Sequence, residues 1–159
     1  MAGPRARRMA LSVASVALMG CGSTATFATP TTSPAFIQQY ANAGTALDTA
    51  TTLWDTLGQS LVAAGTNTVA NEAPVNAAYA QALQTFSNTV LGIQFPASAH
   101  NDVHTLVAAA DAVRTDLAGV ASGAVTTSQF VSDESNLQAA INIVQRDIGL
   151  GSSTPIAGA

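Results

Sequence analysis

The stretch SPAFIQQYANAGTALDTATTLWDTLGQSL, residues 33–61, decides the fold. Its apolar side chains recur at alternating spacings of four and three residues, and they are Phe36, Tyr40, Ala43, Leu47, Ala50, Trp54, Leu57 and Leu61. This spacing places all of them on one face of an α-helix, which we call the apolar seam. Ser33 can cap such a helix, and Pro34 can occupy its first position, where the missing N–H costs nothing. We therefore predict a helix over residues 34–62 with the seam buried.

Three further segments show the same spacing, so we predict three further helices. They cover residues 72–94, 98–120 and 127–149. Pro96 stops the first of these, Ser98 can cap the second, and Thr126 with Gln129 has the capping-box spacing before the third. No segment alternates apolar and polar residues as a strand does, and alanine, the best helix former, supplies 33 of 159 residues. With short connections, the expected fold is an all-α, antiparallel up-down-up-down four-helix bundle.

The first 20 residues have the composition of a bacterial export signal. Arg5, Arg7 and Arg8, three of the five basic residues, precede an apolar run over residues 9–20. That run of about 12 residues is shorter than the roughly 20 that a transmembrane helix needs. We therefore expect residues 1–20 to be a signal peptide that is removed.

The only cysteine of the chain follows this run directly. In Leu18-Met19-Gly20-Cys21 an aliphatic residue stands three positions before the cysteine, and a small residue stands just before it. The segment resembles the lipobox of bacterial lipoproteins, which implies a diacylglycerol thioether on Cys21, cleavage before it, and retention on the outer face of the cell membrane. The alternative is an ordinary secretory signal with an accidental cysteine, which leaves a free thiol near the mature N-terminus, an unusual feature in an exported protein.

Segments without helical periodicity flank the expected bundle on both sides. Residues 21–33 comprise Cys21 and a stretch rich in threonine, serine and proline, which predicts a flexible tether. The tether is either a bare linker or a stretch that carries O-glycosylation. Residues 150–159 predict a disordered tail, so the bundle itself is expected over residues 34–149.

Removal of the signal peptide makes the chain more acidic. Residues 21–159 keep two basic residues, Arg114 and Arg146, against nine acidic ones, which gives a formal charge of −7. Such a surface repels phosphate backbones, so nucleic acid is excluded as a partner. Membrane contact is then expected to come from the N-terminal lipid.

His100 and His104 are the only histidines and lie four residues apart. On a helix this spacing brings two imidazoles to one face, as metal chelation requires. Asp102 points away from both, and Asp147 is the third ligand that an antiparallel bundle would bring nearest. The sequence leaves two interpretations open, a weak metal site through His100 and His104 or a pair of surface histidines.

Charged residues elsewhere on the predicted helices suggest structural roles. Arg114 and Glu134 stand ten residues on either side of Ala124, in the middle of the last connection. Antiparallel packing puts them at the same height, so we predict an ion pair that fixes the register of the last two helices. Asp48 and Asp55 lie seven residues apart on one helix and are expected to be solvated.

Aromatic residues occupy positions of the apolar faces, and we expect them to form core rather than a ligand site. They are Tyr40, Trp54, Tyr79, Phe86 and Phe130. Aromatic and alanine positions that face one another could still leave an apolar cavity, and a cavity of several hundred Å³ would favour ligand carriage.

The motif content argues against an enzyme, because no nucleophile elbow and no phosphate-binding loop is present. No cofactor is expected. The lipobox, the threonine-rich tether and the alanine-rich helices together resemble the small lipoproteins of actinobacteria, the mycobacterial type in particular, which implies an envelope location and supplies no activity.

Three functions follow in order of expectation. The first is a non-enzymatic, lipid-anchored interaction or scaffold module on the cell envelope, with an envelope protein as its partner. The alternative is a carrier of a small apolar or lipid ligand in the bundle core. Weak metal binding through His100 and His104 is third.

Overall fold

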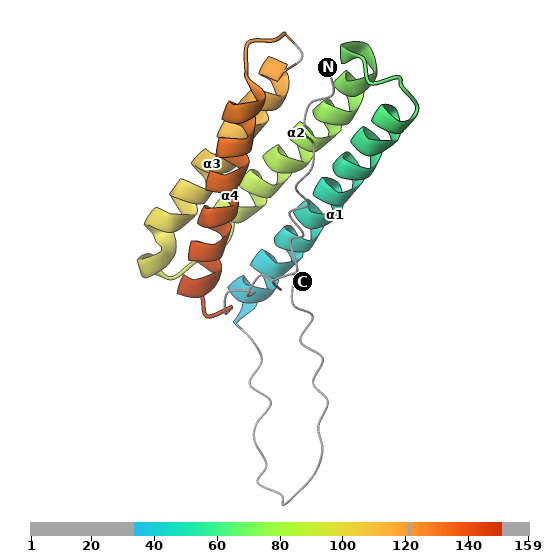
Figure 1. Cartoon of the computed structure of the whole chain (residues 1–159). Coiled ribbons are helices and arrows are strands. Elements are labelled where there is room, and N and C mark those ends of the chain that lie inside the picture. Colours follow the sequence, from blue (N-terminus) through green and yellow to red (C-terminus); the bar gives the residue numbers. More distant parts are fainter. Residues whose placement is uncertain (1–33, 121, 151–159) are drawn as a thin grey trace, which may run out of the picture.

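Four α-helices and one short 3₁₀ helix make up the part of the chain that the structure describes (Figure 1). The computed structural model describes residues 34–120 and 122–150. The elements in chain order are α1 (Ala35–Ala63), α2 (Val69–Leu91), η1 (Ala97–Ala99), α3 (His100–Val120) and α4 (Thr127–Asp147). No strand occurs in these described ranges, so the predicted all-α class is confirmed.

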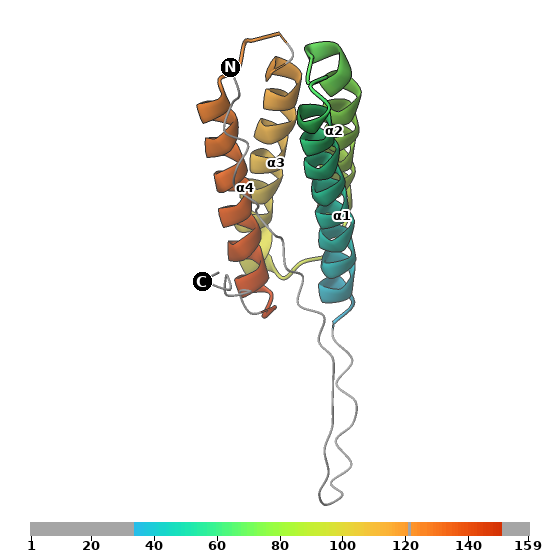
Figure 2. The same cartoon turned by 45° about the vertical axis from the view of Figure 1, so that its right-hand side comes forward.

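The helices alternate in direction along the chain, as the predicted up-down-up-down bundle requires. Consecutive helices pack against each other, α1 on α2, α2 on α3 and α3 on α4 (Figures 1 and 2). The first and last helices, both described over their full length, do not pack in this way, because no Cα atom of α1 lies within 8 Å of one in α4. The bundle is therefore open between α1 and α4.

Threonine side chains cap two of the helices. Thr68 Oγ1 accepts a hydrogen bond from the Asn71 N–H at 3.3 Å, and Thr126 Oγ1 accepts one from the Gln129 N–H at 3.2 Å. The second contact is the predicted cap of the last helix. The Gln129 side chain does not return the bond as in a full capping box but donates to Asp133 Oδ2 at 2.8 Å.

The beginnings of three helices differ from the prediction. Pro34 stands one position before α1 rather than in it, and Ser33 lies outside the described residues. Because Thr68 caps α2, that helix begins at Val69 and contains Pro74, which is exposed and close enough to the helix start for water to reach the freed carbonyl. Ser98 does not cap the third helix but lies inside η1, and α3 begins at His100.

Aromatic side chains close one end of the bundle. The ring of Phe95, in the loop between α2 and η1, lies 6.2 Å from that of Phe36 and 5.9 Å from that of Tyr40, measured between centroids. Tyr40 in turn lies 6.5 Å from Phe86 of α2. These contacts join the start of α1 to the loop that leads into α3.

Burial along the apolar seam is deepest from Tyr40 to Leu47 and lower towards both ends of α1, where Phe36 and Leu61 are half-buried. Tyr40, Ala43 and Leu47 are buried, Trp54 is half-buried, and Leu57 is 40% exposed. The prediction that the whole seam is buried is therefore wrong for its last part. The apolar spacing of α1 continues to Leu61. The last part of the seam is nevertheless not covered by α4, because no Cα atom of α4 lies within 8 Å of one in α1.

The hydrophobic core of the described residues draws on all four α-helices, on the loop before η1 and on the residues that follow α4. Its buried apolar residues begin at Tyr40 and end at Ile148, and the partly buried residues packed on it begin at Phe36 and end at Leu150. We therefore expect residues 34–150 to fold on their own. None of the described helices is both long and apolar enough to cross a membrane.

Candidate functional site: the groove between α1 and α4

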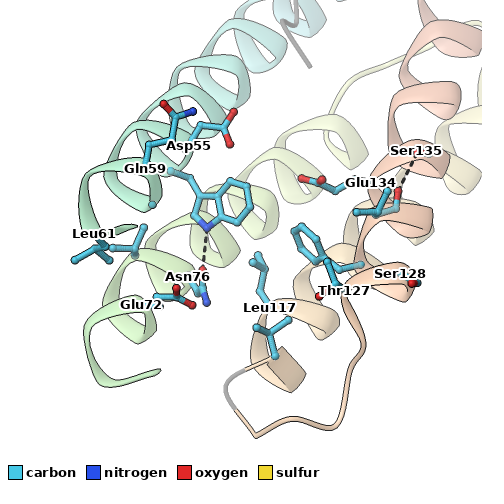
Figure 3. Close-up of a pocket in the computed structure, with 16 residues that line it drawn as sticks. Asp55, Gln59, Leu61, Glu72, Asn76, Leu117, Thr127, Ser128, Glu134 and Ser135 are labelled. Atoms are coloured by element: carbon cyan, nitrogen blue, oxygen red, sulfur yellow. Dashed lines mark hydrogen bonds between the residues drawn. The ribbon is translucent and has the colours of Figure 1, made fainter. Parts of the chain in front are cut away.

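A groove of about 630 Å³ lies between α1 and α4, at the end of the bundle where α1 ends and α4 begins (Figure 3). We call it the α1–α4 groove. All four α-helices contribute to its lining, which consists of Trp54, Asp55, Gly58, Gln59, Leu61, Glu72, Val75, Asn76, Leu117, Val120, Thr127, Ser128, Phe130, Val131, Glu134 and Ser135. Its volume is in the range of pockets that hold small molecules.

Trp54 forms the aromatic centre of the groove. Its ring stacks on Tyr79 at a centroid distance of 5.2 Å and approaches Phe130 of α4 at 5.7 Å. The indole Nε1–H donates a hydrogen bond of 2.9 Å to Oδ1 of the buried Asn76 (Figure 3). This bond satisfies the one polar atom of the indole and fixes the ring orientation, so the groove presents a preformed apolar surface.

Three carboxylates from different helices line the groove: Asp55 of α1, Glu72 of α2 and Glu134 of α4. Figure 3 shows Asp55 and Glu134 on opposite walls. Partial burial, and after it the nearby negative charge of Asp55, raises the pKa of Glu134 to about 7.

The pKa of Tyr79 is raised in part by the same carboxylates. Burial raises the pKa of Tyr79 to about 12, the hydrogen bond with Thr51 opposes this shift, and the charges of Glu134 and Asp55 add to it. Thr51 Oγ1 and Tyr79 OH are 3.3 Å apart. The charges of Glu134 and Asp55 therefore act on the Tyr79 hydroxyl in the same direction as its burial.

Among the residues that the structure describes, no basic side chain lines the groove, and both arginines of the helices lie elsewhere. Arg114 Nε donates to Asp111 Oδ1 at 3.2 Å, and Arg146 Nε donates to Asp147 Oδ1 at 3.3 Å.

The predicted ion pair between Arg114 and Glu134 is not formed. Arg114 contacts Asp111, three residues earlier on the same helix, where the i, i+3 spacing brings the two side chains together locally. Glu134 instead lines the α1–α4 groove. Spacing from the middle of a connection does not determine which neighbour a side chain faces, so the ion pair could not be predicted from it.

The predicted metal ligands His100 and His104 are both exposed and lie near the start of α3. His100 Nε2 lies 3.1 Å from the Phe95 carbonyl oxygen, which accepts the ring N–H. No set of three or more His, Cys, Asp or Glu side chains among the described residues is arranged to hold a metal ion.

Asp147 does not join the histidines as a third ligand. It shares a hydrogen bond with Asp102, which raises the pKa of Asp102. The start of α3 does lie beside the end of α4, as expected of antiparallel helices, but Asp102 rather than the histidine pair faces Asp147.

The predicted lipidation site lies outside the described residues. This holds for Leu18, Met19, Gly20 and Cys21, for the tether up to Ser33, and for residues 151–159 of the predicted tail. These interpretations stay predictions from the sequence.

Sequence reasoning missed Asp55 and Trp54 as groove residues, since it predicted a solvated carboxylate and a core indole. A signal was present in α4. Phe130 and Leu137 are seven residues apart on the apolar face of α4. Glu134 stands four residues after Phe130 and three before Leu137, so a carboxylate interrupts this apolar face. A carboxylate at such a position indicates either a buried partner or an incomplete interface, and the structure shows an incomplete interface.

Comparison with known proteins gives no relative of this chain. No family model matches it, and no curated protein and no solved structure shows significant similarity to it.

Proposed function

We propose that this chain is a lipid-anchored protein of the bacterial cell envelope whose helical domain binds a small apolar ligand in the α1–α4 groove. The observation that carries the proposal is the groove itself, about 630 Å³ in volume with Trp54 and Phe130 in its lining. A fully closed four-helix bundle would have filled this space with side chains. The proposal favours the carrier over the scaffold module that the sequence suggested first.

Ligand binding is tested through Trp54, which is the only tryptophan of the chain. Residues 34–150 are titrated with decanol, an uncharged aliphatic probe, and the emission of Trp54 is recorded. Because the indole lines the groove, we expect a saturable shift of its emission.

Two glycines of α1 provide a matched pair of variants for this test. Gly58 lines the groove, whereas a side chain at Gly44 would meet nothing within 4 Å. Gly58→Leu fills the groove and should weaken decanol binding at least ~10-fold, and Gly44→Leu should leave it unchanged. Equal affinities in the two variants, or no saturable signal in the unmodified domain, would argue against a binding groove.

The lipid anchor is supported by the resemblance of Leu18-Met19-Gly20-Cys21 to a lipobox. Mass spectrometry of the protein isolated from membranes of its host is expected to find Cys21 as the first residue, carrying a diacylglyceryl group and fatty acyl chains. Cys21→Ala should lose both the modification and the cleavage before position 21. An unmodified Cys21 inside a longer or shorter mature chain contradicts the anchor.

An interaction module remains the second candidate because apolar side chains beside the groove are exposed. Leu53 of α1 is 56% exposed and Val131 of α4 is 48% exposed. Capture of an envelope protein that is lost in Leu53→Ser, and decanol binding that fails, would together favour this candidate.

A further inference from the structure

Glu134 places a carboxyl group among apolar side chains of the α1–α4 groove. It is half-buried on α4, between Phe130 and Leu137 of the apolar face. The lining around it includes Phe130 and Val131 of the same helix and Trp54 of α1. Figure 3 shows the carboxyl group pointing from α4 into the groove. A ligand in the groove therefore lies against this group and displaces water from it.

Burial already disfavours the ionised form of Glu134. It raises the pKa of Glu134 to about 7, and the negative charge of Asp55 adds to this shift. A ligand that excludes water deepens the burial and moves the equilibrium further toward the protonated form. Because coupling between two binding events is reciprocal, an uncharged ligand then binds more tightly when Glu134 is protonated.

Other titratable groups lie in the lining or next to it. They are Asp55 of α1, Glu72 and Tyr79 of α2, Asp133 of α4, and Asp116 of α3, which shares a hydrogen bond with Asp133. The pKa of Tyr79 is raised to about 12, so its hydroxyl stays uncharged between pH 5.5 and 8.5. The variant Glu134→Gln leaves all five groups in place and so separates their effect from that of Glu134.

A protonated carboxyl group is also a hydrogen-bond donor. Its O–H needs an acceptor once a ligand has displaced the water around it, because a buried polar group without a partner is destabilising. A carbonyl oxygen accepts a hydrogen bond and has no proton to donate, so it matches the protonated form and not the carboxylate. The protonation state of Glu134 therefore selects for this chemical group.

The groove is long enough for an aliphatic chain beside the carbonyl group. Its lining on α1 runs from Trp54 to Leu61 and its lining on α4 from Thr127 to Ser135. At 1.5 Å per residue these segments are each roughly 10 Å long, so a chain of moderate length can lie along them over Trp54 and Phe130.

We propose that the α1–α4 groove binds an uncharged aliphatic molecule whose carbonyl oxygen accepts a hydrogen bond from the protonated carboxyl group of Glu134. Above neutral pH the proton comes from the solvent, so the protein takes up a proton when it binds the ligand. Aliphatic ketones and esters belong to this class. This inference rests on the proposed function and adds the chemical class of the ligand and the pH dependence of its binding.

Two probes of ten carbon atoms test the hydrogen bond. 2-Decanone only accepts hydrogen bonds, whereas decanol also donates and can therefore bind a carboxylate. Both are titrated into residues 34–150 at pH 5.5 and at pH 8.5 by isothermal titration calorimetry. Since Glu134 is mostly protonated at the first pH and mostly ionised at the second, we expect the affinity for 2-decanone to fall at least ~10-fold. The affinity for decanol should fall less.

Proton uptake is measured directly by calorimetry at pH 7.5 in two buffers with different enthalpies of ionisation. Binding of 2-decanone to the wild-type domain should take up more than about half a proton, because most Glu134 side chains are ionised before binding. The same measurement in Glu134→Gln should find no uptake. This count also tests the inference in the wild type alone, should Glu134→Gln fail to fold.

Two variants locate the titrating group. Glu134→Gln keeps a hydrogen-bond donor that does not titrate, so at pH 8.5 it should bind 2-decanone at least ~10-fold more tightly than the wild type does. Such a gain in affinity cannot come from damage to the fold. Asp48→Asn removes a carboxylate from α1 outside the groove lining and should keep the pH dependence of the wild type.

The outcomes distinguish this inference from the proposed function. If neither probe binds at either pH, the proposed function itself fails. If decanol binds and 2-decanone does not, or if 2-decanone binds equally well at both pH values, only this inference is overturned. A pH dependence that persists in Glu134→Gln, or one that is equal for the two probes, would also overturn it.

Discussion

Glu134 makes the stability of the domain depend on pH in an unusual direction for a carboxylate. Its pKa is raised from 4.5 to about 7 on folding, so the folded state holds the proton more tightly than the unfolded state does. Its contribution to stability is therefore fully present below pH 4.5 and is lost as the pH rises through about 7. Asp102 and Asp116, whose pKa values are also raised, add to the trend in the same direction.

The variant Glu134→Gln isolates this contribution. We expect it to match the wild type at pH 4.5 and to be more stable at pH 8 by about 1–2 kcal/mol, allowing for the partial exposure of the side chain, or roughly 5 °C in Tm. Thermal unfolding of residues 34–150 followed by circular dichroism between pH 4.5 and 8 measures the difference. A constant offset across this range would show that the carboxyl does not titrate abnormally.

Tyr40 and Tyr79 are both buried but differ in the environment of the hydroxyl group. The Tyr40 OH has no hydrogen-bond partner among the described residues, whereas the Tyr79 OH bonds to Thr51. A buried hydroxyl without a partner loses its hydrogen bonds to water on folding and gains none in the protein. Tyr40→Phe should therefore raise the free energy of unfolding by about 1 kcal/mol. Tyr79→Phe, the matched control, should lower it by about 1 kcal/mol. Urea unfolding gives both values, and a loss of stability in Tyr40→Phe contradicts the assignment.

At the scale of single elements, two glycines of the helices are expected to respond oppositely to the same substitution. A Cβ at Gly44 of α1 meets no atom within 4 Å, so Gly44→Ala should stabilise the domain by about 0.5–1 kcal/mol through helix propensity. At Gly119 of α3 a Cβ would overlap with the side chain of Val125, which is stiff because it branches at Cβ. Gly119→Ala should therefore destabilise by about 1–3 kcal/mol in the same urea experiment. Similar changes in the free energy of unfolding for both variants would mean that the loop containing Val125 can shift to make room for the added methyl group.

The sequence was sufficient to predict helices because their signals are local. Periodicity and capping residues placed all four α-helices with ends within about three residues of those observed, and Thr126 caps α4 as expected. Helix starts were less predictable where two local signals compete. Thr68 and Pro74 both favour a helix start, and the side-chain bond made by Thr68 decides in favour of the earlier one.

The groove was less predictable because it depends on the distance between helices that are remote in sequence. The apolar seam of α1 has the same spacing where it is buried at Leu47 as where it is exposed at Leu57. No property of one helix shows whether another helix covers it. Phe95 joins the start of α1 to the loop before α3 by two ring contacts. At the opposite end of the bundle, where α1 ends and α4 begins, the one ring contact between these two helices among the described residues is that of Trp54 with Phe130.

At the scale of the whole molecule, this asymmetry predicts that the bundle opens from one end. Amide hydrogens of α1 near Tyr40 and Leu47 lie over buried core, whereas those beyond Trp54 lie along the groove. We expect hydrogen exchange followed by mass spectrometry to show weaker protection of residues 55–63 than of residues 40–47, although both belong to one helix. Phe95→Ala should reduce the protection of residues 40–47, so that the difference in protection between residues 40–47 and residues 55–63 becomes smaller.

A ligand in the groove should reduce this difference in protection, because binding stabilises only the states in which the groove is formed. Saturating decanol is therefore expected to slow exchange in residues 55–63 of α1 and in residues 127–135 of α4 more than in residues 40–47. Gly58→Leu provides the control, since its added side chain fills the groove and should make the response to decanol smaller. Equal protection along the whole of α1 before ligand is added would mean that its last turns are as stable as its first. The gap between α1 and α4 would then not promote local unfolding of α1.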